Sequence, residues 1–125
     1  MGNKLSPYSK KISVVMPVYN AEAFLGDAIE SILDQTFPNF EFIIVDDAST
    51  DNSSKIIKDY LKLDKRIVLL SNEKNLGIAE TRPKGTKYAK GKYIAVADAD
   101  DNSISTRFAK QHDYLESNSE CGGVG

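Results

Sequence analysis

The chain has 125 residues, 41% of them hydrophobic and 27% charged, which is the balance of one ordinary globular domain with a sizeable core. Its net charge of −2 gives no electrostatic case for a nucleic-acid partner, and its one cysteine excludes an internal disulfide or a cysteine zinc cage and favours a cytoplasmic location. No apolar run approaches the roughly 20 residues that a membrane span needs, so we expect no membrane segment in this chain.

Four short apolar runs alternate with stretches of helical periodicity, a pattern typical of right-handed crossovers and a mostly parallel sheet. The sequence therefore predicts an α/β fold of the Rossmann-like, three-layer α/β/α kind. The predicted elements are, in chain order, a flexible leader over 1–11, a strand over 12–16 stopped by Pro17, a helix over 22–35, a strand over 42–45, a helix capped by 49–52 and reaching 63, a strand over 67–70, a helix from the turn at 75–77 to about 89, a strand over 93–97, a helix over about 106–117 and the opening of a fifth strand over 121–125.

Acidic residues follow two of the predicted strands. Asp46 and Asp47 end the second, and Asp98, Asp100 and Asp101 end the fourth. The carboxyl ends of parallel strands share one edge of a sheet, so we expect these side chains to converge on one crevice. Packed carboxylates repel one another unless a cation neutralises them, and oxygen ligands suit Mg²⁺ or Mn²⁺.

A nucleoside diphosphate fits the chemistry of such a crevice. A divalent metal would bind the phosphates, Tyr19 could stack on a base, and Asp47 could accept hydrogen bonds from a base or ribose. The sequence has neither of the glycine-rich phosphate loops GxxxxGK[ST] and GxGxxG, so the metal would carry most of the phosphate recognition.

Each of these features also has a plainer explanation. The pair Asp46 and Asp47 could simply form a turn near a helix cap, and residues 98–101 could be a solvated loop or the cap of the last helix. Tyr19 could be an aromatic residue on a rim with no ligand, and Arg82 could equally bind phosphate or sit in a surface ion pair.

Six short motifs in order resemble the N-terminal half of the family-2 glycosyltransferases, which have the A-type nucleotide-sugar-dependent fold. The similarity runs from Ile12 to the last residue, Gly125, so residues 12–125 would be the nucleotide-sugar-binding part of a glycosyltransferase domain whose C-terminal acceptor half is absent. The motifs are residues 12–20, 31–36, 42–51, 72–77, 89–93 and the DxD motif Asp98-Ala99-Asp100.

The resemblance implies a role for each matching residue. Asp100 would be the main protein ligand of Mg²⁺ or Mn²⁺, and Asp98 would hold the ribose or reach the metal. In the rest of the site, Pro17, Tyr19 and Glu22 would border the base, Asp47 would hydrogen-bond it, Asp46 would support the turn, and Arg82 would face the nucleotide. Pro83 follows that arginine where the family often has asparagine, so we expect the helix to kink there.

The implied reaction is transfer of a sugar from a nucleoside diphosphate donor, a UDP-sugar first among the candidates, to an acceptor hydroxyl with inversion. The family's catalytic base comes from a later segment, so we expect the base beyond Gly125 and no catalytic residue within the chain. The chain would then be a fragment with little activity alone and with exposed faces able to form a homodimer. Polysaccharide, lipid-linked and protein acceptors all stay open. The alternatives are a phospho-receiver domain, a haloacid-dehalogenase-type phosphatase and an inactive nucleotide-binding module.

Overall fold

The computed structural model describes residues 12–35 and 39–99. Within them, strands and helices alternate strictly, as the hydrophobic pattern predicts. The elements are β1 (Ile12–Val18), α1 (Glu22–Leu33), β2 (Phe40–Asp46), α2 (Ser53–Leu63), β3 (Ile67–Ser71), α3 (Ile78–Tyr88) and β4 (Tyr93–Val96).

Several predictions concern residues outside these ranges. They are the leader, the helix over 106–117, the opening of a fifth strand, and the acidic residues Asp100 and Asp101. Gly125, beyond which we expect the catalytic base, also lies outside the described residues. The location of that base therefore stays a prediction.

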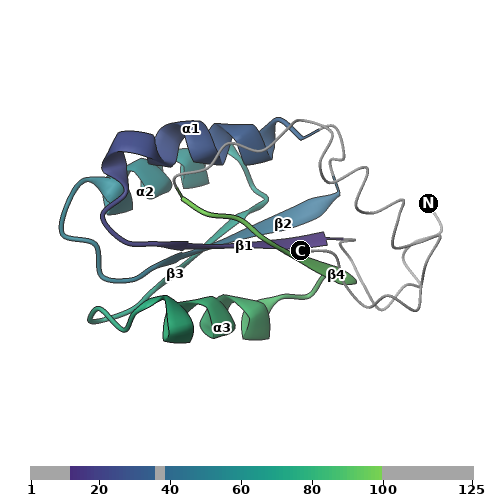
Figure 1. The fold of residues 1–125 in the computed structure, drawn as a ribbon. Helices are drawn as coiled ribbons and strands as arrows, with labels where there is room; N and C mark the ends of the chain where they lie inside the picture. Colours follow the sequence, from purple (N-terminus) through teal and green to yellow (C-terminus); the bar gives the residue numbers. More distant parts are fainter. Residues whose placement is uncertain (1–11, 36–38, 100–125) are drawn as a thin grey trace.

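The four strands form one parallel sheet in the order β3-β2-β1-β4. From β1 the chain steps outward through β2 to β3, and then returns across the sheet to place β4 on the other side of β1. Figure 1 shows the matching change of face, with α1 and α2 on one side of the sheet and α3 on the other. The predicted α/β fold is therefore confirmed, and the winding reverses between β1 and β4, the position where open parallel sheets bind ligands.

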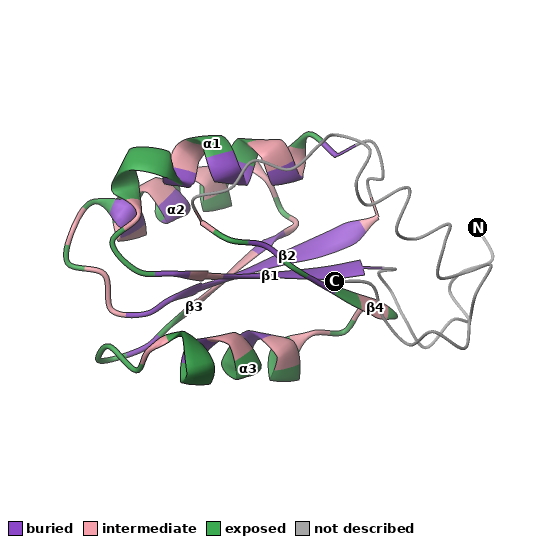
Figure 2. Ribbon diagram, in the orientation of Figure 1, coloured by how far each residue is buried: buried purple, intermediate pink, exposed green. Residues whose placement is uncertain are grey.

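The core lies on both faces of the two central strands. Every residue of β2 is buried, as is all of β1 except the half-buried Pro17, and Figure 2 shows both strands as a buried band between the helices. On the α1 and α2 face, a large cluster joins Leu25, Ile29 and Ile57 to the sheet. Burial on both faces explains why these strands are continuous apolar runs rather than alternating ones.

The core on the α3 face is thinner and depends on a glycine. Val15, Ile43 and Val45 form its buried centre. A Cβ built on Gly85 of α3 would lie 2.5 Å from Val15 Cγ1 and 3.1 Å from Val45 Cγ2. The absence of a side chain at Gly85 therefore lets this helix approach the sheet closely.

Pro17 lies inside β1 rather than after it, which corrects the predicted end of this strand. The oxygen of Val15 accepts a hydrogen bond from the amide of Ala97, so residues 15 and 17 both direct their backbone groups toward β4. The last β4 residue paired with β1 is Val96, opposite Val15. Proline loses no hydrogen bond here, because no β4 residue pairs with position 17.

Helix α3 also contains a proline and continues through it to Tyr88. Pro83 therefore does not end the helix, and Arg82, one residue earlier, keeps a helical position facing the end of β4. No helix in the described part of the chain has the length and apolar character to cross a membrane.

A buried hydrogen-bond network fastens the amino-terminal edge of the sheet. The hydroxyl of Ser13 donates to Glu41 Oε2 at 2.5 Å, and the amide of Lys90 donates to the same oxygen at 2.6 Å. The amide of Gly91 donates to Ser13 Oγ at 2.7 Å. A Cβ at Gly91 would lie 2.6 Å from the Ser13 nitrogen, so this network also requires a glycine. It joins β1, β2 and the start of β4 at one point.

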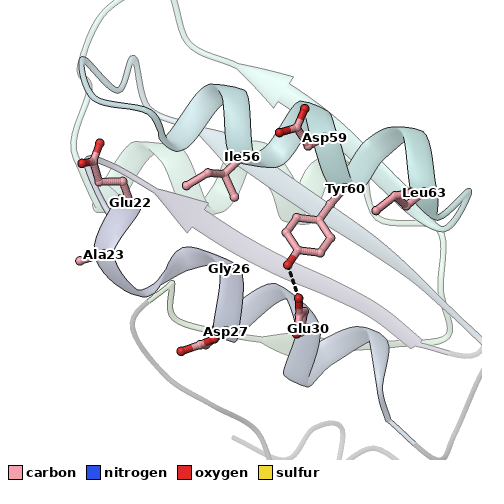
Figure 3. A pocket seen from close by; sticks show the side chains of 9 residues that line it. All are labelled: Glu22, Ala23, Gly26, Asp27, Glu30, Ile56, Asp59, Tyr60 and Leu63. Atoms are coloured by element: carbon pink, nitrogen blue, oxygen red, sulfur yellow. Dashed lines mark hydrogen bonds between the residues drawn. The ribbon is translucent and has the colours of Figure 1, made fainter.

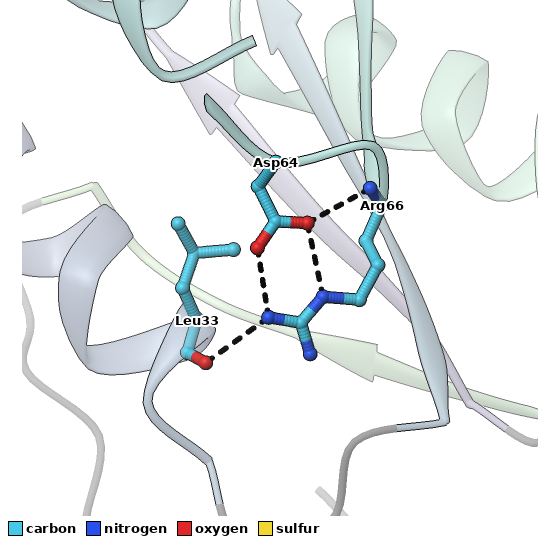
Figure 4. Close-up of polar contacts among 3 residues, drawn as sticks. All are labelled: Leu33, Asp64 and Arg66. Atoms are coloured by element: carbon cyan, nitrogen blue, oxygen red, sulfur yellow. Dashed lines mark hydrogen bonds and ion pairs between the residues drawn. The ribbon is translucent and has the colours of Figure 1, made fainter. Parts of the chain in front are cut away.

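A second polar cluster connects the end of α1 to the turn before β3. Arg66 makes two parallel bonds to Asp64, from Nη2 at 2.8 Å and Nε at 3.0 Å, and Nη2 also donates to the Leu33 oxygen at 3.2 Å (Figure 4). The Arg66 guanidinium lies 4.4 Å from the centre of the Phe40 ring. A bidentate, partly buried arginine of this kind fixes geometry as well as neutralising charge.

Candidate nucleotide-binding site at the switch point

A cavity of about 480 Å³ opens where the winding of the sheet reverses. Tyr19 follows β1 on one side of it, and Asp98 and Ala99 follow β4 on the other. Phe24 of α1 and Ile78 of α3 supply apolar walls. Tyr19, Phe24 and Ile78 are each at least half exposed, at 50%, 58% and 56%, so they present bare apolar surface to a ligand.

A smaller cavity of about 80 Å³ adjoins the first and shares Pro17, Tyr19 and Ile78 with it. Its other lining residues include Asp47 and Thr81. The structure thus brings four of the predicted residues, Pro17, Tyr19, Asp47 and Asp98, to two neighbouring cavities. A mostly apolar slot next to a wider opening with both polar and apolar walls has the outline of a site for a planar ring with a charged substituent.

Arg82 faces the site from α3. Its Nη2 lies 3.7 Å from Asp98 Oδ1, and both side chains are about half exposed. Its Nε is buried and has no hydrogen-bond partner among the described residues. Such a long, exposed ion pair is weak, so both groups can engage a ligand at little energetic cost.

Asp47, in contrast, is buried and surrounded by donors. Oδ1 accepts from Asn72 Nδ2 and the Leu76 amide, both at 2.8 Å, and Oδ2 accepts from Asn75 Nδ2 and the Gly77 amide, both at 2.9 Å. All four lone-pair positions of the carboxylate are therefore occupied. Burial raises the pKa of Asp47, but the bonds from Leu76, Asn72 and Gly77 outweigh that effect and lower it below the ordinary value of 3.8.

Asp47 thereby fixes the segment that leads into α3. Gly77, the residue before this helix, has φ +88, a conformation that suits glycine, and its amide is one of the Asp47 donors. Asn72 extends the cluster, because it donates to Thr81 Oγ1 at 3.1 Å and accepts from Lys84 Nζ at 2.8 Å. Asn72 and Thr81 were not predicted as site residues, and the only signal was that Asn72 begins one of the six motifs.

Asp46 is also buried, and its Oδ1 accepts a bond from the Ser49 amide at 3.2 Å. The carboxylates were expected to converge on one crevice, and the described residues show this only in part. Asp46 and Asp47 bond to the protein itself, and Asp98 alone among the three points its charge at the larger cavity.

The loop that carries Tyr19 is tied to the loop after β2. Asn20, with φ +47, accepts from the Thr50 amide at 2.7 Å, and its own amide donates to Ser49 Oγ at 3.0 Å. Asp51 accepts hydrogen bonds from the amides of Ser53 and Glu22, at 2.9 Å and 3.2 Å. One carboxylate therefore binds the first backbone amide of both α2 and α1. These bonds hold Tyr19 at the cavity mouth.

Glu22 does not line either cavity. Its Oε1 accepts from the Asn52 amide at 2.8 Å, which directs the side chain toward α2 and away from the switch point. Phe24, two residues later, lines the larger cavity instead. Phe24 was not among the predicted site residues.

The predicted metal ligands, Asp98 and Asp100, follow β4 in the sequence. The described residues hold no group of three or more histidine, cysteine or acidic side chains placed to share an ion. Asp98 fits the chemistry of Mg²⁺ or Mn²⁺, because it is an exposed carboxylate bonded only loosely to Arg82. Asp100, the other predicted ligand, lies outside the described residues.

Comparison with known proteins identifies the family. The family model described as glycosyl transferase family 2 matches residues 13–124. Among curated proteins, the uncharacterised glycosyltransferase MJ1057 of Methanocaldococcus jannaschii is 47% identical over 109 residues, which cover 86% of this chain and 38% of that protein. TuaG of Bacillus subtilis, a glycosyltransferase named for teichuronic acid biosynthesis, is 40% identical over 104 residues, which cover 83% of this chain and 41% of TuaG.

Solved structures agree. The crystal structure of S. aureus TarS residues 1–349 in complex with UDP superposes with a TM-score of 0.82 at 28% identity, covering 87% of this chain and 33% of that one. The mannosyltransferase PcManGT of Pyrobaculum calidifontis, solved with GDP-Man and Mn²⁺, shares the fold with a TM-score of 0.79 at 22% identity, covering 86% of this chain and 33% of that one. The chain thus spans well under half the length of these relatives. It belongs to glycosyl transferase family 2 and has the A-type glycosyltransferase fold.

Proposed function

We propose that this chain forms the donor-binding part of a metal-dependent, inverting glycosyltransferase that uses a nucleoside diphosphate sugar. The observation that carries the proposal is the cavity at the switch point, which Tyr19 and Asp98 line, with Arg82 of α3 paired to Asp98 beside it. An aromatic ring, a cation and an exposed carboxylate are the groups that a base, a diphosphate and a metal or ribose require.

The base would enter the smaller cavity, between Tyr19 and Ile78. A uracil ring suits its small volume of about 80 Å³ better than a purine, and the UDP complex of TarS, at 28% identity, supports a UDP-sugar. Asp47 lies at the wall of this cavity. For it to hydrogen-bond the base as predicted, one of its four present donors must give up its bond.

The diphosphate and the sugar would occupy the larger cavity. Asp98 and Asp100 would hold Mg²⁺ or Mn²⁺, which supplies positive charge to the departing diphosphate. Arg82 would add a cation on the same side, because its Nη2 lies 3.7 Å from Asp98 Oδ1. Between them these residues orient the donor with its phosphates toward the end of β4.

A base that deprotonates the acceptor hydroxyl is expected from a segment beyond Gly125, as is the acceptor site. We therefore expect the 125 residues to bind the donor but to transfer sugar poorly. TuaG is named for teichuronic acid biosynthesis, and on that basis we propose a growing polysaccharide as the acceptor here. The single cysteine suits a reaction in a reducing compartment, the cytoplasm.

The sheet order argues against the phospho-receiver alternative. Receiver domains wind their strands in the order 2-1-3-4-5, whereas β2 here separates β1 from β3. The acidic pair Asp46 and Asp47 also follows β2 rather than β1, and Asp47 is fully occupied by protein donors. The match to glycosyl transferase family 2 over residues 13–124 argues against a haloacid-dehalogenase-type phosphatase. The remaining alternative is a catalytically inactive nucleotide-binding module, and sugar transfer by a longer chain that contains the acceptor half would exclude it.

Calorimetric titration of UDP into the 125-residue chain tests the proposal. With Mn²⁺ present, we expect binding at least about tenfold tighter than without it, a difference of about 1.4 kcal/mol. Asp98→Asn and Asp100→Ala should each remove most of that gain. Asp34→Asn, a carboxylate change at the far end of α1, should leave it intact. Identical isotherms for all four proteins, with and without metal, would refute the proposed site.

A further inference from the structure

A second cavity, of about 510 Å³, lies between α1 and α2 and shares no lining residue with the switch-point cavities. Figure 3 shows it from close by, with side chains of both helices directed toward it. Its lining combines an apolar set, Ala23, Gly26, Ile56, Tyr60 and Leu63, with four carboxylates, Glu22, Asp27, Glu30 and Asp59. No lysine or arginine belongs to this lining, so the groove concentrates negative charge.

Internal contacts shape the groove and neutralise only part of its negative charge. The Tyr60 hydroxyl donates to Glu30 Oε2 at 2.5 Å across the two helices (Figure 3). Asp59 pairs with Lys55 one turn away on the same helix, at 3.2 Å between exposed groups. Leu63, which lines the groove at the end of α2, remains 80% exposed. The groove therefore offers both charge and bare apolar surface.

A row of lysines lies next to the groove, on the outer side of α2. Lys55, Lys58 and Lys62 recur at i, i+3 and i+7, so they share one helix face, and all three are exposed. An acidic groove and a basic ridge thus stand side by side on one surface. This is the arrangement that makes a surface complementary to its own copy after a two-fold rotation.

We propose that the groove between α1 and α2 is a dimer interface, occupied by α2 of a second copy of this chain. The lysine row of each copy would lie in the groove of the other, against Asp27 and Glu30, and Leu63 would be covered in both. Each contact between residue i of one copy and residue j of its partner then has an equivalent contact between j of the first copy and i of the second, as a two-fold interface requires. The strand-end cavities stay open, because none of their residues takes part.

The strength of such a dimer follows from its chemistry. Its ion pairs join side chains that are exposed in the free chain, and such pairs are individually weak and screened by salt. We therefore expect a dimer that sedimentation detects at micromolar to millimolar chain concentrations and that weakens by at least about tenfold when salt rises from about 0.05 M to about 0.5 M.

Charge reversal in two complementary variants tests the interface. Lys58→Glu with Lys62→Glu makes both surfaces acidic, and Asp27→Lys with Glu30→Lys makes both basic. Each variant alone should be monomeric by sedimentation equilibrium, and an equimolar mixture should form a heterodimer, since each acidic ridge meets a basic groove and each basic ridge an acidic groove. The matched control, Glu80→Lys with Lys87→Glu on exposed positions of α3, should dimerise as the original chain does.

Several results would overturn the proposal: a monomeric original chain at low salt, a dimer in either charge-reversed variant, or a mixture that stays monomeric. If replacing Glu30 disturbs the fold by removing the Tyr60 bond, Leu63→Asp replaces it as the test, because a side chain already 80% exposed is not needed for folding. This variant should be folded and monomeric, and a dimer of unchanged strength would refute the interface. UDP binding is measured separately, so failure here leaves the proposed donor site untouched.

Discussion

Asp47→Asn is expected to destabilise the fold strongly, whereas the same change at Asp98 is expected to have almost no effect. Asp47 accepts four hydrogen bonds in a buried position, from two side-chain amides and the amides of Leu76 and Gly77. An asparagine keeps one acceptor oxygen. Its NH₂ group replaces the other oxygen, and because NH₂ is a donor it cannot accept the two hydrogen bonds that this oxygen received.

The magnitude follows from the bonds that are lost. Hydrogen bonds to a charged group contribute about 1.5–3 kcal/mol each, so losing two of the four predicts a loss of about 3–6 kcal/mol in the free energy of unfolding. Asp98 is about half exposed with one long ion pair, so Asp98→Asn should change that free energy by less than about 0.5 kcal/mol.

Urea unfolding followed by circular dichroism measures both variants. With a slope of about 1–3 kcal/mol per molar urea, Asp47→Asn should lower the unfolding midpoint by at least about 1 M. A loss below about 1 kcal/mol would refute the reasoning, because it would mean that the donors around Asp47 find other partners at no energetic cost.

A pH series gives an independent check on the same carboxylate. The pKa of Asp47 in the folded chain lies below its ordinary value of 3.8, because hydrogen bonds outweigh burial. Its stabilising contribution is therefore present above the unfolded pKa and disappears as pH falls through the folded pKa. The stability difference between the original chain and Asp47→Asn should be constant near neutral pH and shrink below about pH 4.

Three further substitutions test the packing of two helices and the pKa of one tyrosine. In a urea titration, Gly85→Ala should destabilise the fold by about 1–3 kcal/mol, because the new Cβ would lie 2.5 Å from Val15 Cγ1. Gly26→Ala on α1 should stabilise the fold by about 0.5–1 kcal/mol, because the new Cβ would lie 3.7 Å from the Tyr60 hydroxyl oxygen and cause no clash. Equal effects of the two substitutions would contradict the close packing of α3 on the sheet. The hydrogen bond to Glu30, together with burial, raises the pKa of Tyr60 to about 12, so ultraviolet titration should show one tyrosine ionising late, and Tyr60→Phe should remove that step.

Much of the fold was predictable because the central strands are buried on both faces. Runs such as Phe42–Val45 have no polar residue to obscure the pattern, and the alternation with helices determines a parallel sheet. The end of β1 was not predictable in the same way. Pro17 is acceptable in a strand only because β4 stops pairing at Val96, and that is a property of the neighbouring strand rather than of the local sequence.

The positions of the candidate residues were easier to predict than their contacts. Tyr19 and Asp98 line one cavity, since the carboxyl ends of parallel strands gather at the same edge, and Arg82 of α3 pairs with Asp98 there. The roles of Asp47 and Glu22 depend on which donors surround them, and those donors come from residues 25 to 30 positions away in the chain. No local pattern identifies such partners, so buried and exposed carboxylates look alike in the sequence.

The network of Ser13, Glu41 and Gly91 has a consequence for the opposite end of the molecule. It fixes the first residues of β4 against β1, yet the two strands pair over only four residues before they diverge around the cavity. The pairing of β1 with β4 is therefore fixed at its amino-terminal end and ends at the cavity. Hydrogen exchange in β4 should be slowest beside Gly91 and fastest toward Asp98, so the cleft can adjust its width to a ligand while the register of the sheet stays fixed.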